Sequence, residues 1–99
     1  MLIYNTQVAL KEDLSPLKSE GITIGLVPTM GAIHNGHLAL MKQALEENNI
    51  VVVSIFVNPT QFNNARDLEK YPRTLDRDVA LIEKLSDKII VFAPSVEDI

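Results

Sequence analysis

The 99-residue sequence contains no cysteine and no tryptophan, and only two histidines and four glycines. Without cysteine, the chain can form neither disulfides nor thiolate metal sites. Acidic residues outnumber basic ones by 13 to 9, which gives a net charge of −4. That balance argues against a nucleic-acid surface, because such a surface needs a basic patch. It leaves a nucleotide site open, because a helix N-terminus can hold phosphate with few basic side chains.

Long apolar runs are also missing. No stretch approaches the roughly 20 apolar residues that a membrane helix needs, and residues 1–13 lack the basic start and apolar core of a signal peptide. We therefore expect a cytoplasmic protein with neither a membrane partner nor a nucleic-acid partner. Hydrophobic residues make up 46% of the chain and charged residues 22%, as in globular proteins, and the length allows one domain at most.

Apolar patterns along the chain predict alternating strands and helices. Three short runs rich in β-branched residues predict buried strands, and two amphipathic patterns between them predict helices. The strands are expected at 22–28, 50–57 and 88–93, and the helices at 34–47 and 74–85. This order is half of a doubly wound α/β fold, so we predict a Rossmann-like parallel sheet with flanking helices.

Less regular segments give weaker patterns. Because Pro16 fits poorly inside a helix, the first twenty residues are expected to form two short helices, with Ser15 capping the second. A helical turn is expected at 67–71. The charges of residues 76–78 are expected on a solvated surface.

Two segments follow the ends of predicted strands, 28–35 and 58–64, where doubly wound sheets carry their sites. The first lies within VPTMGAIHNGHLALM, residues 27–41, which holds both histidines and two of the four glycines. His34 and His37 share one face of a first helical turn. The N–H groups of that turn have no helical partners and, helped by the helix dipole and the imidazoles, can meet an anion. Gly36 would let a flat ring or ribose approach the backbone. Gly31 would do the same where the chain leaves the strand, or would supply a positive φ.

Other interpretations of the same residues remain open. The two histidines could be solvated or could cap the helix, and a metal pair would need a third ligand that the neighbouring sequence does not offer. Gly31 and Gly36 have the spacing of a phosphate-binding loop, but the Lys-Ser/Thr that completes such a loop is missing.

The His-x-Gly-His motif at 34–37, opening a helix after an apolar strand, resembles the nucleotidylyltransferase superfamily, which shares this signature with class I aminoacyl-tRNA synthetases. Three stretches in order, VPTMGAIHNGHLAL, VVVSIFVNPTQFNNARDLEKYPRTLDRDVALI and IIVFAPSVEDI, resemble the pantothenate synthetase (pantoate–β-alanine ligase) family. The resemblance implies that ATP, with Mg²⁺, adenylates the carboxylate of pantoate and releases pyrophosphate. The amine of β-alanine then attacks the pantoyl-adenylate and releases AMP.

The resemblance also implies roles for individual residues. His37 and His34 are expected to be catalytic, stabilising the phosphates of ATP. Pantoate and β-alanine are expected to contact Gln61, Asn58 and Met30, and no residue is expected to bind a metal. The ATP-binding segment is expected to comprise Met30, Gly31, Ala32, Ile33, His34, Asn35, Gly36 and His37.

Length is the main departure from the family, whose members have a longer first domain, a second C-terminal domain and a homodimeric assembly. Residues 1–99 would then be part of the N-terminal nucleotide-binding domain, with half of the site. We expect this chain alone to be inactive and to leave one edge of strand 22–28 unpaired. The alternatives are a non-catalytic fragment that self-associates through that edge, and another nucleotidylyltransferase with a different acceptor.

Overall fold

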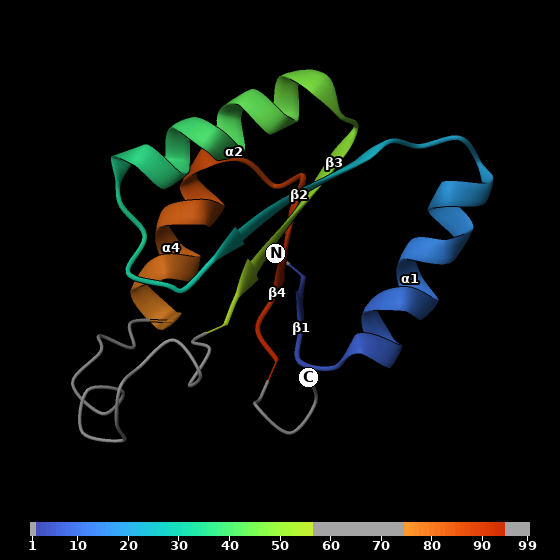
Figure 1. Ribbon diagram of the computed structural model, residues 1–99, viewed down its shortest axis with the longest axis horizontal. Helices are drawn as coiled ribbons and strands as arrows, with labels where there is room; N and C mark the ends of the chain where they lie inside the picture. The colour runs from blue at the N-terminus through green and yellow to red at the C-terminus, as the bar shows by residue number, and fades with distance from the viewer. Residues whose placement is uncertain (1, 57–74, 95–99) are drawn as a thin grey trace.

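The computed structural model describes residues 2–56 and 75–94, which form a parallel sheet with helices on both faces (Figure 1). In chain order the elements are β1 (Ile3–Tyr4), α1 (Gln7–Ser19), β2 (Ile24–Thr29), α2 (Asn35–Glu47), β3 (Ile50–Ile55), α4 (Leu75–Leu85) and β4 (Ile89–Phe92). The predicted α/β fold with a parallel sheet is thereby confirmed. The expected loop at 58–64 and the helical turn at 67–71 lie outside the described residues.

All strand pairs are parallel, and the strand order is β1-β4-β3-β2. β3 is the central strand that its apolar sequence predicts, because it is covered on both faces. Val51 and Val53 point into the core beneath α2 and α4, whereas Val52 packs on the opposite face with Leu14 of α1. The alternation of these valines across the pleat therefore builds two cores from one strand.

The strand β2 lies at an edge of the described sheet, pairing with β3 alone among the described strands. The predicted open edge is therefore confirmed for this part of the chain. The side chain of Leu26, a residue of β2, is 66% exposed. An edge with free main-chain groups and exposed apolar side chains is suited to pairing with further chain.

The first helix differs from the prediction. α1 is a single helix, with Thr6 as its N-cap and Pro16 in its interior, so Ser15 does not begin a second helix. Proline at this position removes one intrahelical hydrogen bond. Leu14 and Leu17, on either side of it, both pack against the sheet, and this packing keeps the helix continuous because tertiary contacts supply most helical stability.

The prediction also missed β1, because two residues carry no recognisable apolar pattern. Ile3 pairs with Val91 and Tyr4 with Phe92, which places β1 beside β4. None of the helices in residues 2–56 and 75–94 is long and apolar enough to cross a bilayer.

Candidate functional site

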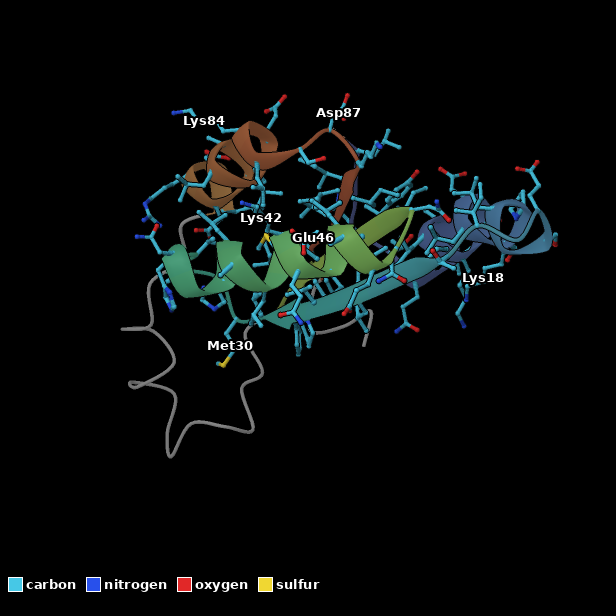
Figure 2. The ribbon with its side chains drawn as sticks, turned by 90° about the horizontal axis from the view of Figure 1, so that it is seen from above. Lys18, Met30, Lys42, Glu46, Lys84 and Asp87 are labelled. Carbon is cyan, nitrogen blue, oxygen red and sulfur yellow. The ribbon has the colours of Figure 1, made fainter. Side chains whose placement is uncertain are left out.

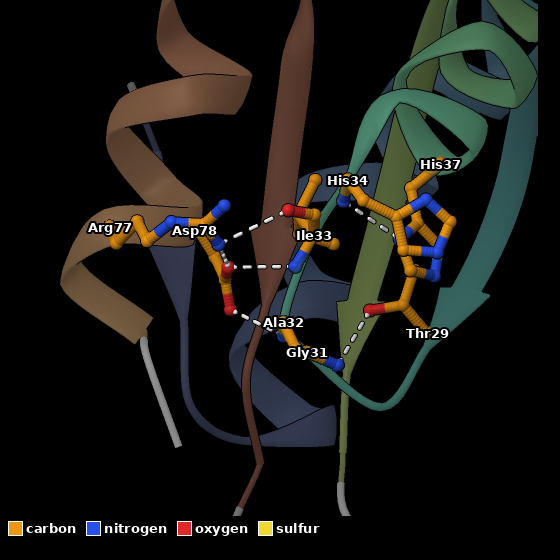
Figure 3. A network of polar contacts seen from close by, with 8 residues as sticks. All are labelled: Thr29, Gly31, Ala32, Ile33, His34, His37, Arg77 and Asp78. Atoms are coloured by element: carbon orange, nitrogen blue, oxygen red, sulfur yellow. Dashed lines mark hydrogen bonds and ion pairs between the residues drawn. The ribbon is translucent and has the colours of Figure 1, made fainter. Parts of the chain in front are cut away.

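The candidate site begins where β2 and β3 end side by side. The Thr29 hydroxyl donates a hydrogen bond to the Ser54 carbonyl at 3.0 Å. It also accepts one from the Gly31 N–H at 3.2 Å (Figure 3). The N–H of Phe56 donates to the carbonyl of Thr29 at 3.0 Å. The loop that leads to α2 therefore starts from a fixed point at the carboxyl edge of the sheet, which is where the predicted fold places a ligand site.

The loop turns through two consecutive residues with positive φ, Gly31 at 87° and Ala32 at 51°. Glycine adopts this conformation freely, whereas an alanine there costs roughly 1 to 2 kcal/mol. A Cβ atom on Gly31 would lie 3.4 Å from Oδ2 of Asp78 and 3.4 Å from Cγ2 of Ile55. The turn therefore runs close against both α4 and β3.

Asp78, in the first turn of α4, is fully buried, so the expectation of a solvated carboxylate at this position was wrong. Its two oxygens accept hydrogen bonds from consecutive main-chain N–H groups, Oδ2 from Ala32 at 3.0 Å and Oδ1 from Ile33 at 2.9 Å (Figure 3). The physical reason is helical register, because Asp78 lies on the same inward face as Ile82, one turn later.

Arg77, which precedes Asp78 in α4, bonds to the same loop. Its Nη1 donates to the carbonyl of Ile33 at 3.1 Å and lies 3.4 Å from Oδ1 of Asp78. The Arg77 side chain is 57% exposed, so its predicted place on a solvated surface is only partly right, whereas Asp76 is exposed as expected. The N–H and the carbonyl of Ile33 are thus both bonded to α4, and its side chain is fully buried.

The two histidines cap helix α2 reciprocally. His34 is the N-cap, and its Nδ1 accepts from the N–H of Gly36 at 3.0 Å, while the N–H of His34 donates to Nδ1 of His37 at 3.1 Å. The ring centroids are 4.1 Å apart, with an interplanar angle of 40°. The capping interpretation of the pair is therefore confirmed. The N–H of Gly36 has no partner among the helix carbonyls, as expected, but it bonds to the His34 ring.

Gly36 leaves space for the imidazole ring of His34. A Cβ atom at this position would lie 2.8 Å from Cε1 of His34 and 3.1 Å from its Nδ1. The flat ring that Gly36 admits in this structure is therefore the imidazole of His34, which needs that space to cap the helix.

These hydrogen bonds determine the tautomer of each neutral ring. A neutral imidazole has one acceptor nitrogen and one N–H, and Nδ1 is the acceptor in both histidines. The proton therefore lies on Nε2, and each ring has an Nε2–H donor. Partial burial lowers the pKa of His37, the neighbouring His34 lowers it further, and the carboxylate of Asp78 opposes the change. Both factors that lower it favour the neutral ring.

The remaining predicted site residues divide into two groups. Met30 is half-buried, and Figure 2 shows its side chain projecting from the loop on the side away from α4. Asn35 is exposed in the first turn of α2. Asn58 and Gln61 lie outside the described residues, and their roles stay predictions. Within residues 2–56 and 75–94, no group of three or more His, Cys, Asp or Glu side chains is arranged to hold a metal ion.

Sequence reasoning located the histidines and glycines but missed Thr29, Arg77 and Asp78. An acid in a first helical turn is usually explained by the helix dipole, which hid the buried role of Asp78. The usable signal was its spacing from Ile82 and Leu85, because positions i, i+4 and i+7 share one helix face.

Comparison with known proteins gives a consistent result. The family model for pantoate-beta-alanine ligase matches residues 2–99. Pantothenate synthetase of Flavobacterium psychrophilum is 59% identical over 99 residues, and that of Phocaeicola vulgatus is 60% identical over 99 residues. Both alignments cover 100% of this chain and 35% of the relative, so the chain spans about a third of the length of these curated relatives.

Solved structures match in the same way. Pantoate-beta-alanine ligase of Francisella tularensis, in complex with beta-gamma ATP and beta-alanine, has a TM-score of 0.82 and 45% identity, covering 99% of this chain and 37% of its own. The pantothenate synthetase structure from Thermus thermophilus has a TM-score of 0.77 and 42% identity, covering 99% of this chain and 33% of its own.

Proposed function

Because this chain belongs to the pantoate–β-alanine ligase family, we propose that the protein joins pantoate to β-alanine with ATP to form pantothenate. A carboxylate oxygen of pantoate attacks the α-phosphorus of ATP, and the bond from that phosphorus to the bridging oxygen of pyrophosphate breaks. The amine of β-alanine then attacks the pantoyl carbon, loses a proton, and displaces AMP. Activation is needed because AMP is a far better leaving group than oxide.

The observation that carries this proposal is the reciprocal capping of His34 and His37 at the start of α2. Capping leaves each ring with an Nε2–H donor, at the helix end whose dipole favours anions. We assign both donors to the phosphates of ATP, where negative charge develops as pyrophosphate leaves. Electrostatic stabilisation by preorganised donors of this kind is usually the largest single contribution to a rate enhancement.

The rest of the ATP-binding segment, residues 30–37, would contribute shape. Positive φ at Gly31 and Ala32 turns the loop from β2 into α2, so that the phosphates would meet the histidine rings. Met30, Asn58 and Gln61 are proposed for pantoate and β-alanine, since the amide of Gln61 can donate and accept at once. Mg²⁺ enters only as the ion that accompanies ATP, and no protein ligand is assigned to it.

We further propose that residues 1–99 are the N-terminal part of a larger Rossmann-like domain, in a cytoplasmic enzyme that forms a homodimer. The match to about a third of each relative supports this, as does the open edge of β2. The 99-residue chain alone is then inactive, because other parts of the family's sequence complete the site. The same edge, with Leu26 exposed, supports self-association of the isolated chain.

Pantoate-dependent exchange between pyrophosphate and ATP tests the activity, measured on a full-length enzyme that contains this 99-residue sequence. Exchange that requires pantoate but not β-alanine, and AMP release that requires both, is the expected result. His37→Ala should reduce exchange by about a hundredfold or more, as loss of one such donor does elsewhere. Exchange without pantoate, or with another acid in its place, would contradict the proposal. The 99-residue chain, assayed in parallel, should show neither reaction.

A further inference from the structure

The carboxylate of Asp78 is buried beside the site, and the proposed reaction gives it no role. It lies in α4, yet both of its oxygens bond to main-chain N–H groups of the loop before α2, which are 46 and 45 positions earlier in the chain. Its side chain has no exposed area. Such a group does not face bulk solvent, and its hydrogen bonds tie it to the loop that precedes the two histidines.

A carboxylate suits this position better than any other side chain of its size. Two consecutive N–H groups, from Ala32 and Ile33, each need an acceptor, and a carboxylate offers two oxygens. Asparagine would offer one oxygen and one NH₂, and the NH₂ would face a second donor. Hydrogen bonds to an ionised acceptor are also about twice as strong as those between neutral groups.

The two bonds hold a backbone conformation that its sequence disfavours. Ala32 has a φ of 51°, which L-residues rarely adopt because Cβ then crowds the following carbonyl oxygen. Ile33 is fixed at its N–H by Asp78, at its carbonyl by Arg77 and by its buried side chain. His34, the next residue, begins the reciprocal cap. The contacts from α4 therefore fix the chain up to the residue before His34, where the cap that holds the two imidazoles begins (Figure 3).

We propose that Asp78 is a positioning residue of the ATP site, which holds the Ala32–Ile33 segment so that the Nε2–H donors of His34 and His37 point at the phosphates. Arg77 supports it by holding the carbonyl of Ile33. This inference rests on the proposed function, since it assumes that the histidines bind ATP. It assigns Asp78 no contact with substrate.

Asp78→Asn in the full-length enzyme tests the proposal. Because a displacement of about 1 Å in a positioned group can cost a hundredfold in rate, we expect kcat for pantoate-dependent exchange to fall by about tenfold to a hundredfold. Asp76→Asn, an exposed acid of the same helical turn, should leave kcat unchanged. Arg77→Ala should also lower kcat, by a smaller factor. Because it removes no buried group, it still tests the proposal if Asp78→Asn fails to fold.

Two further measurements separate positioning from general stability. Ile82→Val weakens the packing of the same helix, since Ile82 is fully buried, but it keeps the carboxylate of Asp78 and its hydrogen bonds; it should lower the thermal midpoint without lowering kcat. Ala32→Gly, combined with Asp78→Asn, should restore part of kcat, because glycine adopts positive φ without an anchor. The ring signals of His34 and His37 in NMR spectra should shift in Asp78→Asn and remain in place in Asp76→Asn.

The outcomes distinguish this inference from the function on which it rests. If the unmodified enzyme shows no pantoate-dependent exchange, the proposed function is wrong. The second case is that exchange is present and His37→Ala removes it. If Asp78→Asn then keeps full kcat, or if Ile82→Val lowers kcat as much as Asp78→Asn does, the positioning role is wrong and the function stands.

Discussion

The main-chain N–H of His34 donates a hydrogen bond to Nδ1 of His37, while Nδ1 of His34 accepts one from Gly36. The two side chains that would meet the phosphates therefore also start the helix that carries them. Capping uses Nδ1 of each ring, and the proposed contact with phosphate would use Nε2, so the two roles can be tested separately.

Two substitutions of His34 make that separation. Asparagine is among the best N-cap residues, and replacing a good cap by alanine costs about 1 kcal/mol. His34→Ala should therefore lower the free energy of unfolding by about that amount, and His34→Asn by less. Both should lose the Nε2–H donor and slow pantoate-dependent exchange to a similar extent. Normal exchange in His34→Asn would show that His34 serves only as a cap.

The stability of the protein should depend on the protonation of His37. Its pKa is lowered in the folded state, chiefly by burial, so folding favours the neutral ring. That contribution is fully present above the ordinary histidine pKa of about 6.5 and is lost as the pH falls through the lowered value. Protonation also removes the Nδ1 acceptor that His34 uses. Urea unfolding at about pH 7.5 and about pH 5 should show this loss.

A matched variant identifies the source of that pH dependence. Glutamine at the third position of a helix can accept the same bond at any pH. His37→Gln should therefore show a smaller change in urea midpoint between the two conditions than the unmodified protein. An equal change in both proteins would place the dependence elsewhere.

Thr29 should be a measurable link between β2, β3 and the loop. Thr29→Val removes the donor to Ser54 and the acceptor for Gly31, and so breaks one part-buried and one buried hydrogen bond. The expected loss in the free energy of unfolding is about 1 to 3 kcal/mol. Thr29→Ser keeps the hydroxyl and should cost clearly less, as judged by urea unfolding of both variants. Equal losses would mean that the methyl group, rather than the hydroxyl, matters.

Pro16→Ala should stabilise the protein by about 1 to 2 kcal/mol, because alanine restores an N–H inside α1 and removes a ring clash. The more flexible unfolded chain offsets part of that increase. Ser15→Ala is the matched control. It should have little effect if α1 is one helix, whereas a capping Ser15 would lose about 1 kcal/mol. Thermal unfolding of the two variants decides between one helix and two.

The parts of the fold that the sequence predicted are those with a strong local pattern. The apolar runs that become β2, β3 and β4 are bounded by turn residues, and the helical periods of α2 and α4 lie between them. β1 has two residues, and its position depends on pairing of Ile3 with Val91, far along the chain. Pro16 misled the prediction because the packing of Leu14 and Leu17 against the sheet outweighs a local preference.

The candidate site divides in the same way. His34, Gly36 and His37 are neighbours in sequence, so their motif and spacing predicted the start of a helix, which the structure confirms. Asp78 and Arg77 act on that helix start from 44 to 46 positions away, and no local pattern records such a contact. The spacing of Asp78 from Ile82 and Leu85 indicates an inward face of the helix, but the partners of Asp78 in the loop needed the packing of α4 to be known.

The link between Asp78 and Ala32 has a consequence for how the protein is made. While the chain leaves the ribosome, β2, α2 and β3 are complete by residue 55, and neighbouring parallel strands can then pair. A nascent chain that ends before residue 78 has the whole His-x-Gly-His motif but no anchor for the turn in front of it. Contacts between such distant positions form late, because the entropy of closing a long loop must first be overcome. The loop shape proposed to bind ATP would therefore be among the last features of this segment to appear, and nucleotide binding would report that α4 has docked.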